Sequence, residues 1–498
     1  MKLFGSIYVG SYEITLKIFE ISKNKGLKEV DFMSTSLDLI SDINKYGKLS
    51  LDTINRLCKI LKDMKKNMDA YKVDEYRLCA NNMLFDADNY PIVVEQIKLK
   101  TGMKAEILSN SERRFLSYLA TASIEDFEKI IDETTVLVDV GGASLQFTLF
   151  EKGEVITTQH IPLGSVSLLD KMKKLEFVIN ADNKMLEYVD KEIDSFKKMY
   201  LKDMNVTNMI ILGDIFVGNA IVELSDKREM SGKKYADYLE SVDTNLIASS
   251  GYVVFSDNEE LIKPYVMIHK SISRTINPNV VHIPSLSVNE GIVLQSAYKH
   301  KWLESTHDFD ADVISAALNI SERYGSFQPH LLALKKLSDM MFDAMKKYHG
   351  MTERDRLLME VVCLLHDCGK YISIASAADC SHQIIMATEI LGLTHKEREL
   401  IATVVYYNRY EIESFEELSD SFTSEEYIKI CKLLAILKVA NALDRSHKQK
   451  MKNVNMKVKD EELLISIEST LSYDLERSMF AEKAEFFESV FAIRPVIK

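Results

Sequence analysis

The sequence contains little cysteine, no long apolar run and no excess of positive charge. Its 6 cysteines include no C-x-x-C pair, so we expect buried or free thiols in a reducing compartment. No stretch of roughly 18 apolar residues occurs, and a transmembrane helix is therefore not expected. Polar residues interrupt the apolar run at the start of the chain, where no signal peptide fits. The simplest location is the cytoplasm.

The formal net charge is −13 at pH 7, which argues against a general binder of nucleic acid or membrane surfaces. This charge does not exclude a local basic cleft for a polyanion. The bulk composition is that of a globular protein, with 46% hydrophobic and 28% charged residues. A chain of 498 residues has room for about three or four domains with substantial cores.

Two segments of the chain, 9–20 and 140–151, repeat each other without a gap at an offset of 131 residues. Each is predicted to form the end of a strand, a tight glycine turn and a returning strand with alternating apolar residues. The small residues of each turn leave backbone N–H groups that can point at one place. Two such hairpins, one per lobe, would clamp a chain of phosphates. The predicted phosphate-binding residues are Gly10, Ser11, Gly141, Gly142, Ala143 and Ser144, together with Gly213 after a later strand.

One position breaks the repeat. The residue before the shared Val-Gly is Asp139 in the second copy and Tyr8 in the first. A phenol with a pKa of about 10 is a poor metal ligand at neutral pH. Asp139 is a candidate metal ligand at a strand end, and the alternative is an aspartate that only accepts hydrogen bonds from its turn.

The chain begins with two blocks of alternating strands and helices, which indicate two similar α/β lobes with a cleft between them. In the first block we expect strands at 3–9, 13–20, 27–37, 75–80 and 105–108, with helices at 50–71 and 111–121. In the second we expect strands at 135–140, 145–151, 155–162 and 207–212, with helices at 182–199 and 292–298.

The pattern becomes helical from 310 to 445, where 329 is the only proline. Seven of the eleven histidines lie at or beyond His307. Strands at 454–459, 463–468 and 491–496 and a helix at 472–490 are expected to close the chain. The predicted fold class is therefore α/β followed by all-α and a small α+β module, with domains at 1–124, 125–304, 305–448 and 449–498.

Several motifs, taken together and in order, resemble those of one family. They are Tyr8-Val9-Gly10-Ser11-Tyr12-Glu13, Ser109-Asn110-Ser111-Glu112-Arg113-Arg114-Phe115-Leu116, Asp139-Val140-Gly141-Gly142-Ala143-Ser144-Leu145-Gln146, Ile161-Pro162-Leu163-Gly164-Ser165-Val166, Asn289-Glu290-Gly291, Leu364-Leu365-His366-Asp367-Cys368-Gly369 and Ala440-Asn441-Ala442-Leu443-Asp444-Arg445. They resemble the exopolyphosphatase and guanosine-pentaphosphate phosphatase family (Ppx/GppA), within the superfamily of sugar kinases, heat-shock chaperone ATPases and actin.

The resemblance implies two ribonuclease-H-like lobes, an HD-like helical domain and a small α+β module. It also implies that the protein forms a homodimer. It also implies hydrolysis of a terminal phosphoanhydride by an activated water, with Mg²⁺ or Mn²⁺ offsetting charge. The implied ligands are inorganic polyphosphate or guanosine penta- or tetraphosphate. Neither a specific nucleic acid nor a membrane is expected as a partner.

The sequence departs from the family pattern in the catalytic motifs. Tyr8 and Gln146 replace an aspartate and a glutamate, and Arg113 replaces the second of two adjacent glutamates. Glu112 is then the best remaining catalytic base, and the alternative is a helix-capping residue beside Ser109. Arg113 and Arg114 either contact phosphate directly or lie on a solvated helix face.

The helical part carries a second group of candidates. His330, His366, Asp367, His382 and Asp444 follow the pattern of an HD phosphohydrolase, whose imidazoles and carboxylates bind a divalent metal. The alternative is a structural remnant that serves as a scaffold. Three functions therefore remain open: phosphoanhydride hydrolysis between the lobes, binding or sensing of the same ligand without cleavage, and metal-dependent hydrolysis in the helical domain.

Overall fold

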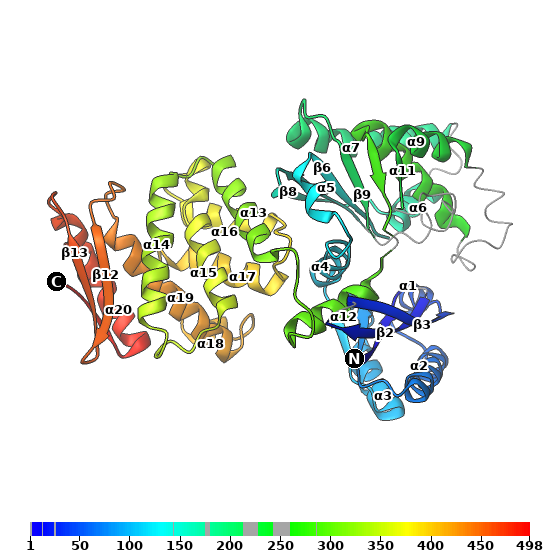
Figure 1. Cartoon of the computed structure of the whole chain (residues 1–498), viewed down its shortest axis with the longest axis horizontal. Coiled ribbons are helices and arrows are strands. Elements are labelled where there is room, and N and C mark those ends of the chain that lie inside the picture. Colours follow the sequence, from blue (N-terminus) through cyan, green and yellow to red (C-terminus); the bar gives the residue numbers. More distant parts are fainter. Residues whose placement is uncertain are drawn as a thin grey trace. The chain divides into compact units, whose positions relative to one another are not determined.

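The computed structural model describes residues 2–11, 13–23, 26–142, 144–174, 180–212, 228–242, 259–284 and 286–498. The chain divides into two compact units, Met1–Asp308 and Phe309–Lys498 (Figure 1). This division lies close to the domain boundary predicted after residue 304. The first unit contains two sheets, and the second contains a helical bundle followed by a small sheet.

The first sheet has the strand order β3-β2-β1-β4-β5. Its strands are β1 (Lys2–Val9), β2 (Glu13–Ser22), β3 (Gly26–Ser36), β4 (Glu75–Asn81) and β5 (Ala105–Leu108). The first three pair antiparallel, and β1, β4 and β5 pair parallel. All five were predicted within one or two residues at either end, because their apolar residues alternate or run together between turn residues.

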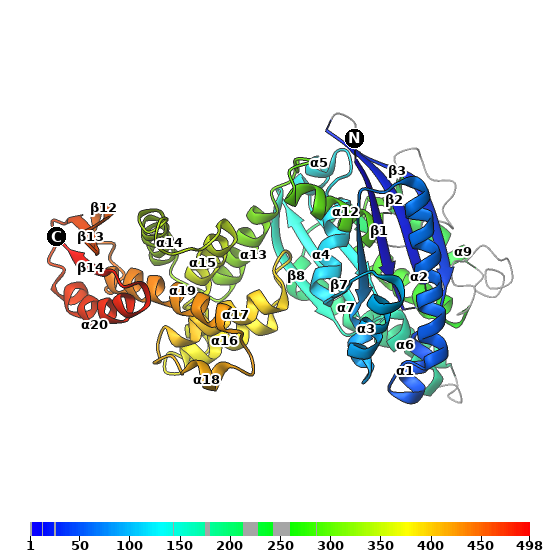
Figure 2. The same ribbon diagram turned by 90° about the horizontal axis from the view of Figure 1, so that it is seen from below.

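Helices cover both faces of this sheet (Figure 2). Ile7, Val9 and Ile14 face a core that includes apolar residues of α2 (Leu51–Tyr71) and α3 (Tyr90–Thr101). The opposite face packs on α4 (Asn110–Thr121) and α12 (Val288–Lys299) through the cluster that contains Phe4, Phe19, Leu116, Ile292 and Val293. Two short helices, α1 (Ile40–Tyr46) and η1 (Asn82–Asp86), complete the lobe, and α1, η1 and α3 were not predicted.

The second sheet has the order β10-β11-β9-β6-β7-β8. Its strands are β6 (Thr135–Val140), β7 (Leu145–Glu151), β8 (Glu154–Ile161), β9 (Asn208–Ile211), β10 (Glu229–Ser231) and β11 (Val280–His282). Its helices are α5 (Phe127–Asp132), α6 (Ser165–Lys174), α7 (Ala181–Phe196) with the π-helical turn η2 (Lys197–Leu201), α9 (Gly232–Ser241), η3 (Glu259–Leu261) and α11 (Ile262–Ile276). Apolar residues of α7, α9 and α11 share one core with Val136, Val138 and Phe147.

The two hairpins have the same backbone register, as the repeat predicts. Val9 pairs with Ile14 and Tyr8 with Thr15, and at the offset of 131 residues Val140 pairs with Leu145 and Asp139 with Gln146. The first turn closes with a hydrogen bond of 2.8 Å from the Gly10 N–H to the Glu13 carbonyl, and the second with one of 2.8 Å from Gly141 to Ser144. The internal duplication is therefore structural as well as sequential.

The predicted boundary between the lobes, which assigned 125–304 to the second lobe, is wrong for α12. This helix packs on β1 and β2 of the first sheet, where Asn289 Oδ1 accepts from Ser6 Oγ at 3.0 Å and its Nδ2 donates to Thr15 Oγ1 at 2.7 Å. Gly291 allows the close crossing with α4, because an added Cβ would lie 2.0 Å from the Leu116 carbonyl oxygen. Sequence order alone did not indicate that the chain returns to its first lobe.

The second unit begins with a bundle of α-helices. They are α13 (Phe309–Arg323), α14 (Gln328–Ala344), α15 (Glu353–Leu365), η4 (Cys368–Tyr371), α16 (Ala377–Ala387), α17 (His395–Tyr407), α18 (Phe415–Leu418) and α19 (Ser424–Leu443). A three-stranded sheet follows, in the order β12-β13-β14, with strands Lys452–Lys459, Glu462–Glu468 and Arg494–Ile497. Helix α20 (Asp474–Phe491) packs against α19 and β14. The predicted α+β module has this order of elements.

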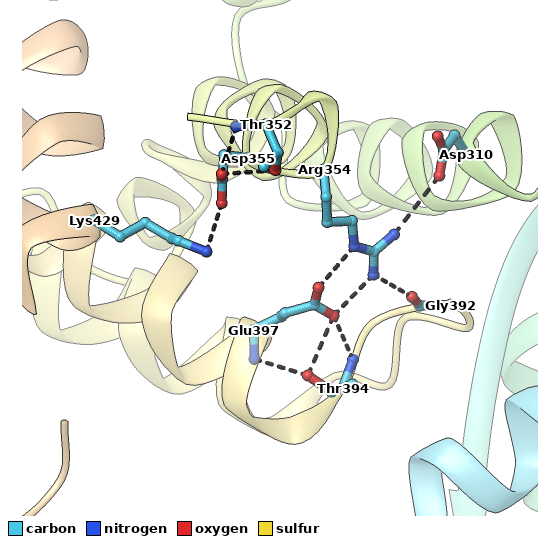
Figure 3. A network of polar contacts seen from close by, with 8 residues as sticks. All are labelled: Asp310, Thr352, Arg354, Asp355, Gly392, Thr394, Glu397 and Lys429. Atoms are coloured by element: carbon cyan, nitrogen blue, oxygen red, sulfur yellow. Dashed lines mark hydrogen bonds and ion pairs between the residues drawn. The ribbon is translucent and has the colours of Figure 1, made fainter. Parts of the chain in front are cut away.

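A polar network joins four helices of this bundle (Figure 3). Arg354 of α15 donates from Nε to Glu397 Oε1 of α17 at 2.7 Å and from Nη2 to the Gly392 carbonyl at 2.6 Å. Its Nη1 lies 3.6 Å from Asp310 Oδ1 of α13. Lys429 of α19 pairs with Asp355 of α15 at 2.6 Å. These charged contacts fix the bundle at its periphery, whereas apolar side chains fill its interior.

All six cysteines are free thiols, as the sequence predicted, and four of them are buried. Within the described ranges, no helix has the length and apolar character needed to cross a membrane.

Candidate functional site

The strand ends of the two lobes and the start of α4 bring three polar side chains together. Asp139 is the penultimate residue of β6, and Arg113 lies in the first turns of α4. Arg113 Nη2 donates to Asp139 Oδ2 at 2.8 Å, with the aspartate side chain 6% exposed and the arginine 19%. The candidate metal ligand therefore has a guanidinium as its partner.

A second arginine reinforces this pairing. Arg114 Nε lies 3.4 Å from the same Asp139 Oδ2, and its Nη2 donates to Ser144 Oγ at 2.7 Å. Both Arg114 and Asp139 are buried. The prediction that these arginines lie on a solvated helix face is wrong, because both side chains turn toward the end of β6 and the second glycine turn.

Tyr8 lies at the end of β1 and packs against the cluster that contains Phe4, Phe19 and Leu116. Desolvation of its hydroxyl, reinforced by the charge of Asp139 and opposed by that of Arg113, raises the pKa of Tyr8 to about 12. The phenol is therefore protonated at any physiological pH and contributes no negative charge. These electrostatic interactions also place Tyr8 beside Arg113 and Asp139, so both hairpins contribute to one site.

Glu112 forms the capping box of α4. The Ser109 N–H donates to Glu112 Oε2 at 2.8 Å, and the Glu112 N–H donates to Ser109 Oγ at 3.2 Å. This is the capping arrangement that the sequence offered as the alternative to a catalytic base. One carboxylate oxygen is thus occupied by the backbone, which leaves a catalytic role for Glu112 as a prediction only.

Gln146 pairs with Asp139 across β6 and β7 and is 3% exposed. Its Oε1 is buried without a hydrogen-bond partner among the described residues.

These residues do not fit a hydrated Mg²⁺ ion. The ion needs nearby negative charge from carboxylates, but Asp139 is the single acidic side chain in the group, and two guanidiniums neutralise it. Tyr8 carries a proton and Gln146 is uncharged. The charges at this site therefore disfavour a bound divalent cation.

In each glycine turn, the first N–H group forms a hydrogen bond within the turn. The Gly10 N–H donates to the Glu13 carbonyl, and the Gly141 N–H donates to the Ser144 carbonyl. Among the described residues, the next N–H group in each turn has no protein acceptor, and these groups belong to the equivalent residues Ser11 and Gly142. They are the donors that remain for a phosphate. Ser144 accepts from Arg114 instead. Ala143 and Gly213, predicted in the same set, lie outside the described residues.

The backbone at Gly164 packs closely against the backbone of the second glycine turn. The Ser165 and Val166 N–H groups donate to the carbonyls of Gly141 and Gly142 at 3.1 and 2.8 Å. An added Cβ on Gly164 would lie 2.4 Å from the Gly142 carbonyl oxygen, so only glycine permits this contact.

In the second unit, four of the predicted residues come together. His330 of α14 donates from Nδ1 to Asp444 Oδ2 at 2.8 Å, beyond the end of α19. The rings of His330 and His366 have centroids 5.2 Å apart, and His366 Nε2 lies 3.3 Å from Asp367 Oδ2. Burial opposes the ionisation of Asp367, but the charges of His366 and Lys370 outweigh it and hold the pKa of this carboxyl far below its usual range.

The ring centroid of the fifth predicted residue, His382, lies 6.0 Å from that of Tyr406. His447, which the sequence pattern did not predict, lies beside His330. Its ring stacks on His330 with centroids 3.6 Å apart, and burial, together with the charges of His330 and Lys370, lowers the pKa of His447 to about 4. The sequence analysis missed His447, although its position three residues after Asp444 was a usable signal.

Comparison with known families identifies the chain. The profile of the Ppx/GppA phosphatase family matches residues 18–300, and that of Ppx/GppA phosphatase domain III matches residues 316–482. The chain belongs to the Ppx/GppA phosphatase family. The first match begins at residue 18, after Tyr8 and the first glycine turn. Tyr8 is one of the positions at which the sequence departs from the family pattern.

One curated relative resembles the chain in part. A bifunctional 3-dehydroquinate synthase/phosphatase from Fusobacterium nucleatum is 24% identical over 217 residues, which cover 40% of this chain and 31% of that protein. The match thus spans about a third of the relative's length.

Two solved structures are similar to part of the chain. The Aquifex aeolicus member of the Ppx/GppA family has a TM-score of 0.50 at 19% identity, covering 62% of this chain and 99% of that one. An exopolyphosphatase from Cytophaga hutchinsonii has a TM-score of 0.48 at 15% identity, covering 61% and 100%. The Aquifex likeness is one of fold, and it confirms the predicted duplicated ribonuclease-H-like lobes.

Proposed function

We propose that this protein binds a phosphoanhydride chain, either inorganic polyphosphate or a guanosine penta- or tetraphosphate, where its two lobes meet, and that it cleaves this ligand slowly or not at all. The proposal combines family membership with the arrangement at Asp139. The single observation that carries it is the ion pair between Arg113 and Asp139 at 2.8 Å.

Hydrolysis of a terminal phosphoanhydride requires stabilisation of charge on the transferred group and a base or positioned water. Here a guanidinium stands beside the strand-end carboxylate, where the family pattern has a glutamate. The neighbouring Glu112 caps its helix. Tyr8 and Gln146 supply no charge. Three acidic groups of the family pattern are absent, so the chemical step has little support.

The features needed for binding remain. The two equivalent turns offer the N–H groups of Ser11 and Gly142, and Arg113 and Arg114 offer several N–H donors in fixed geometry. Guanidiniums bind phosphate oxygens strongly, often through two parallel hydrogen bonds. An incoming phosphate would compete with Asp139 for these donors. The site is thus suited to an anion without a metal.

Slow hydrolysis is the second candidate, because Asp139 and both glycine turns are retained. It is the activity that the family pattern predicts, and Mg²⁺ or Mn²⁺ is the ion that such an activity would require. Such hydrolysis would require Arg113 to release the Asp139 carboxylate.

Two assays on one protein sample distinguish the candidates. The first measures binding of a fluorescent polyphosphate and of guanosine tetraphosphate, and the second measures phosphate release with Mg²⁺ or Mn²⁺. We expect binding that falls steeply with salt, and phosphate release near the background rate. Arg113→Gln should weaken binding about tenfold, which corresponds to about 1.4 kcal/mol for one charged contact. Rapid metal-dependent release by the wild type would favour the second candidate.

A further inference from the structure

A single lysine lies within the buried part of α19. Lys438 interrupts the apolar run at 433–440, and every residue of that run is buried. Lys438 itself is 9% exposed. We propose that the amine of Lys438 reacts reversibly with CO₂ to form a carbamate, whose negative charge the ammonium group of Lys483 balances. This proposal does not depend on the function proposed above.

The amine of Lys438 has few partners. Its Nζ donates to the Tyr410 carbonyl at 3.1 Å and lies 5.1 Å from the centre of the Phe486 ring of α20. Among the described residues, no carboxylate oxygen lies within 4.0 Å of this nitrogen. An ammonium group carries three donors, and the Tyr410 carbonyl accepts from one of them. A buried cation without a carboxylate partner is costly, so this environment favours the neutral amine.

The charged groups around Lys438 come from α20 and from the segment after α17. Lys483 lies one turn before Phe486 on α20, and its charge repels the Lys438 ammonium. Glu482 and Glu411 attract this ammonium, but Glu482 pairs with Lys483. Burial, followed by the charge of Lys483, lowers the pKa of Lys438 to about 8. About a tenth of the amine is therefore neutral at pH 7, against less than about a thousandth for an ordinary lysine.

The reaction is an addition to CO₂. The lone pair of the neutral Lys438 nitrogen forms a bond to the carbon, one C=O π pair moves onto oxygen, and a proton leaves the nitrogen for solvent. The carbamate nitrogen keeps one N–H group, which can still donate to the Tyr410 carbonyl. The new negative charge turns the repulsion from Lys483 into attraction. Because CO₂ is small and uncharged, it suits an amine that is largely enclosed by apolar side chains.

Lys429, on the same helix, is the internal control. Its Nζ lies 2.6 Å from Asp355 Oδ1, and a carboxylate partner favours the charged form of an amine. The full-length protein is incubated with ¹³C-labelled CO₂ and bicarbonate at pH 7. Carbamates are trapped as ethyl esters with triethyloxonium and are located by mass spectrometry after digestion. We expect the label at Lys438 to exceed that at Lys429 at least about tenfold.

Two substitutions test the role of the second amine. Lys483→Met removes both the repulsion that favours the neutral amine and the cation that balances the carbamate, so the label at Lys438 should fall about threefold or more. Lys432→Met is the matched control, because this lysine of α19 donates to the His349 carbonyl instead. It should leave the label at Lys438 unchanged. Equal labels in the two variants would contradict the role of Lys483.

Solution NMR provides a readout that needs no trapping reagent. With ¹³C-labelled CO₂, the wild type should give a carbamate signal that is absent from Lys438→Met, a variant that keeps an apolar chain of similar length in the buried run. A carbamate on a terminal amine persists in both proteins and is distinguished in this way. Thermal melting verifies that each variant is folded.

The pH dependence of the signal is a further check. Carbamate formation consumes neutral amine and also releases a proton, so at constant CO₂ pressure the Lys438 signal should fall steeply from about pH 8 to about pH 6. The proposal is overturned if the wild type shows neither trapped label nor a carbamate signal at Lys438, or if Lys438→Met gives the same NMR signals as the wild type.

Discussion

Arg113 Nη2 donates a hydrogen bond of 2.8 Å to Asp139 Oδ2, which links the start of α4 to the end of β6. The arginine lies where the family pattern has a glutamate. Of the two aspartates that the family pattern places before the glycine turns, this sequence keeps Asp139 and has Tyr8 in place of the other. A substitution of opposite charge has thus turned two groups that would repel each other into an ion pair. Such a pair favours anions and disfavours a metal ion.

Removing the carboxylate tests this interpretation of the pair. Asp139→Asn takes one negative charge from the anion site and releases Arg113, so we expect polyphosphate to bind about 3–10-fold more tightly. Fluorescence titration at two salt concentrations measures the change. The melting temperature of the variant is the control for loss of fold, because the substitution leaves the buried guanidiniums without their carboxylate partner. A weaker-binding but folded variant would show that Asp139 assists binding, as a metal ligand does.

The second glycine turn gives a prediction on stability and binding together. Gly164→Ala places a Cβ 2.4 Å from the Gly142 carbonyl oxygen and the Ser144 nitrogen, which are backbone atoms that cannot rotate away. We expect a loss of about 1–3 kcal/mol in the free energy of unfolding and weaker polyphosphate binding. Chemical denaturation and the same titration check both.

Gly142→Ala is the matched control for this turn. Its added Cβ would meet Val166 Cγ2 at 3.1 Å, and this methyl group can shift with its side chain. Its cost should therefore be clearly smaller than that of Gly164→Ala. Equal losses in the two variants would mean that the close approach at Gly164 does not shape the turn.

The network in Figure 3 predicts acid sensitivity of the second unit. Burial raises the pKa of Glu397, but the hydrogen bond and charge of Arg354, with the bonds from Thr394, outweigh it and lower this pKa below 4.5. The carboxylate therefore stabilises the fold above pH 4.5, and the contribution is lost as the pH falls through the lowered value.

Glu397→Gln isolates this charge, because glutamine can keep the capping interaction with Thr394. At pH 7 the variant should lose about 1–2 kcal/mol in unfolding free energy. The difference from the wild type should shrink at acidic pH, as the pH falls through the lowered pKa and the wild-type carboxylate becomes protonated. Hydrogen–deuterium exchange over α15 and α17 localises the effect. Glu482→Gln, which removes an exposed charge in the same unit, should show no measurable change at either pH.

Local patterns in the sequence predicted many of the strands and the duplication, because period-two apolar residues and glycine turns act at short range. The return of α12 to the first sheet was missed, since the contacts of Asn289 with Ser6 and Thr15 join residues far apart in the chain. Within the site, the departures from the family pattern could be identified from the sequence, but the ion pair between Arg113 and Asp139 could not be predicted from it. That pairing depends on the angle at which α4 meets β6.

The helical unit shows the same limit. The pattern of histidines and aspartates predicted that His330, His366, Asp367 and Asp444 would converge, and they do. It also included His382, whose ring contacts Tyr406, and it omitted His447, which stacks on His330. The segment after α19 folds back on itself at a residue with positive φ, and that local geometry could not be read from residue spacing.

The most direct test of the central claim restores the three missing acidic groups. Phosphate release from polyphosphate with Mg²⁺ is compared between the wild type and the triple variant Tyr8→Asp, Arg113→Glu, Gln146→Glu. We predict release near background for the wild type and an increase of about 10²–10³ for the variant, the range for regained transition-state stabilisation. Adding Asp139→Asn to the variant should abolish the gain. Rapid release by the wild type, abolished by Asp139→Asn alone, would contradict the account.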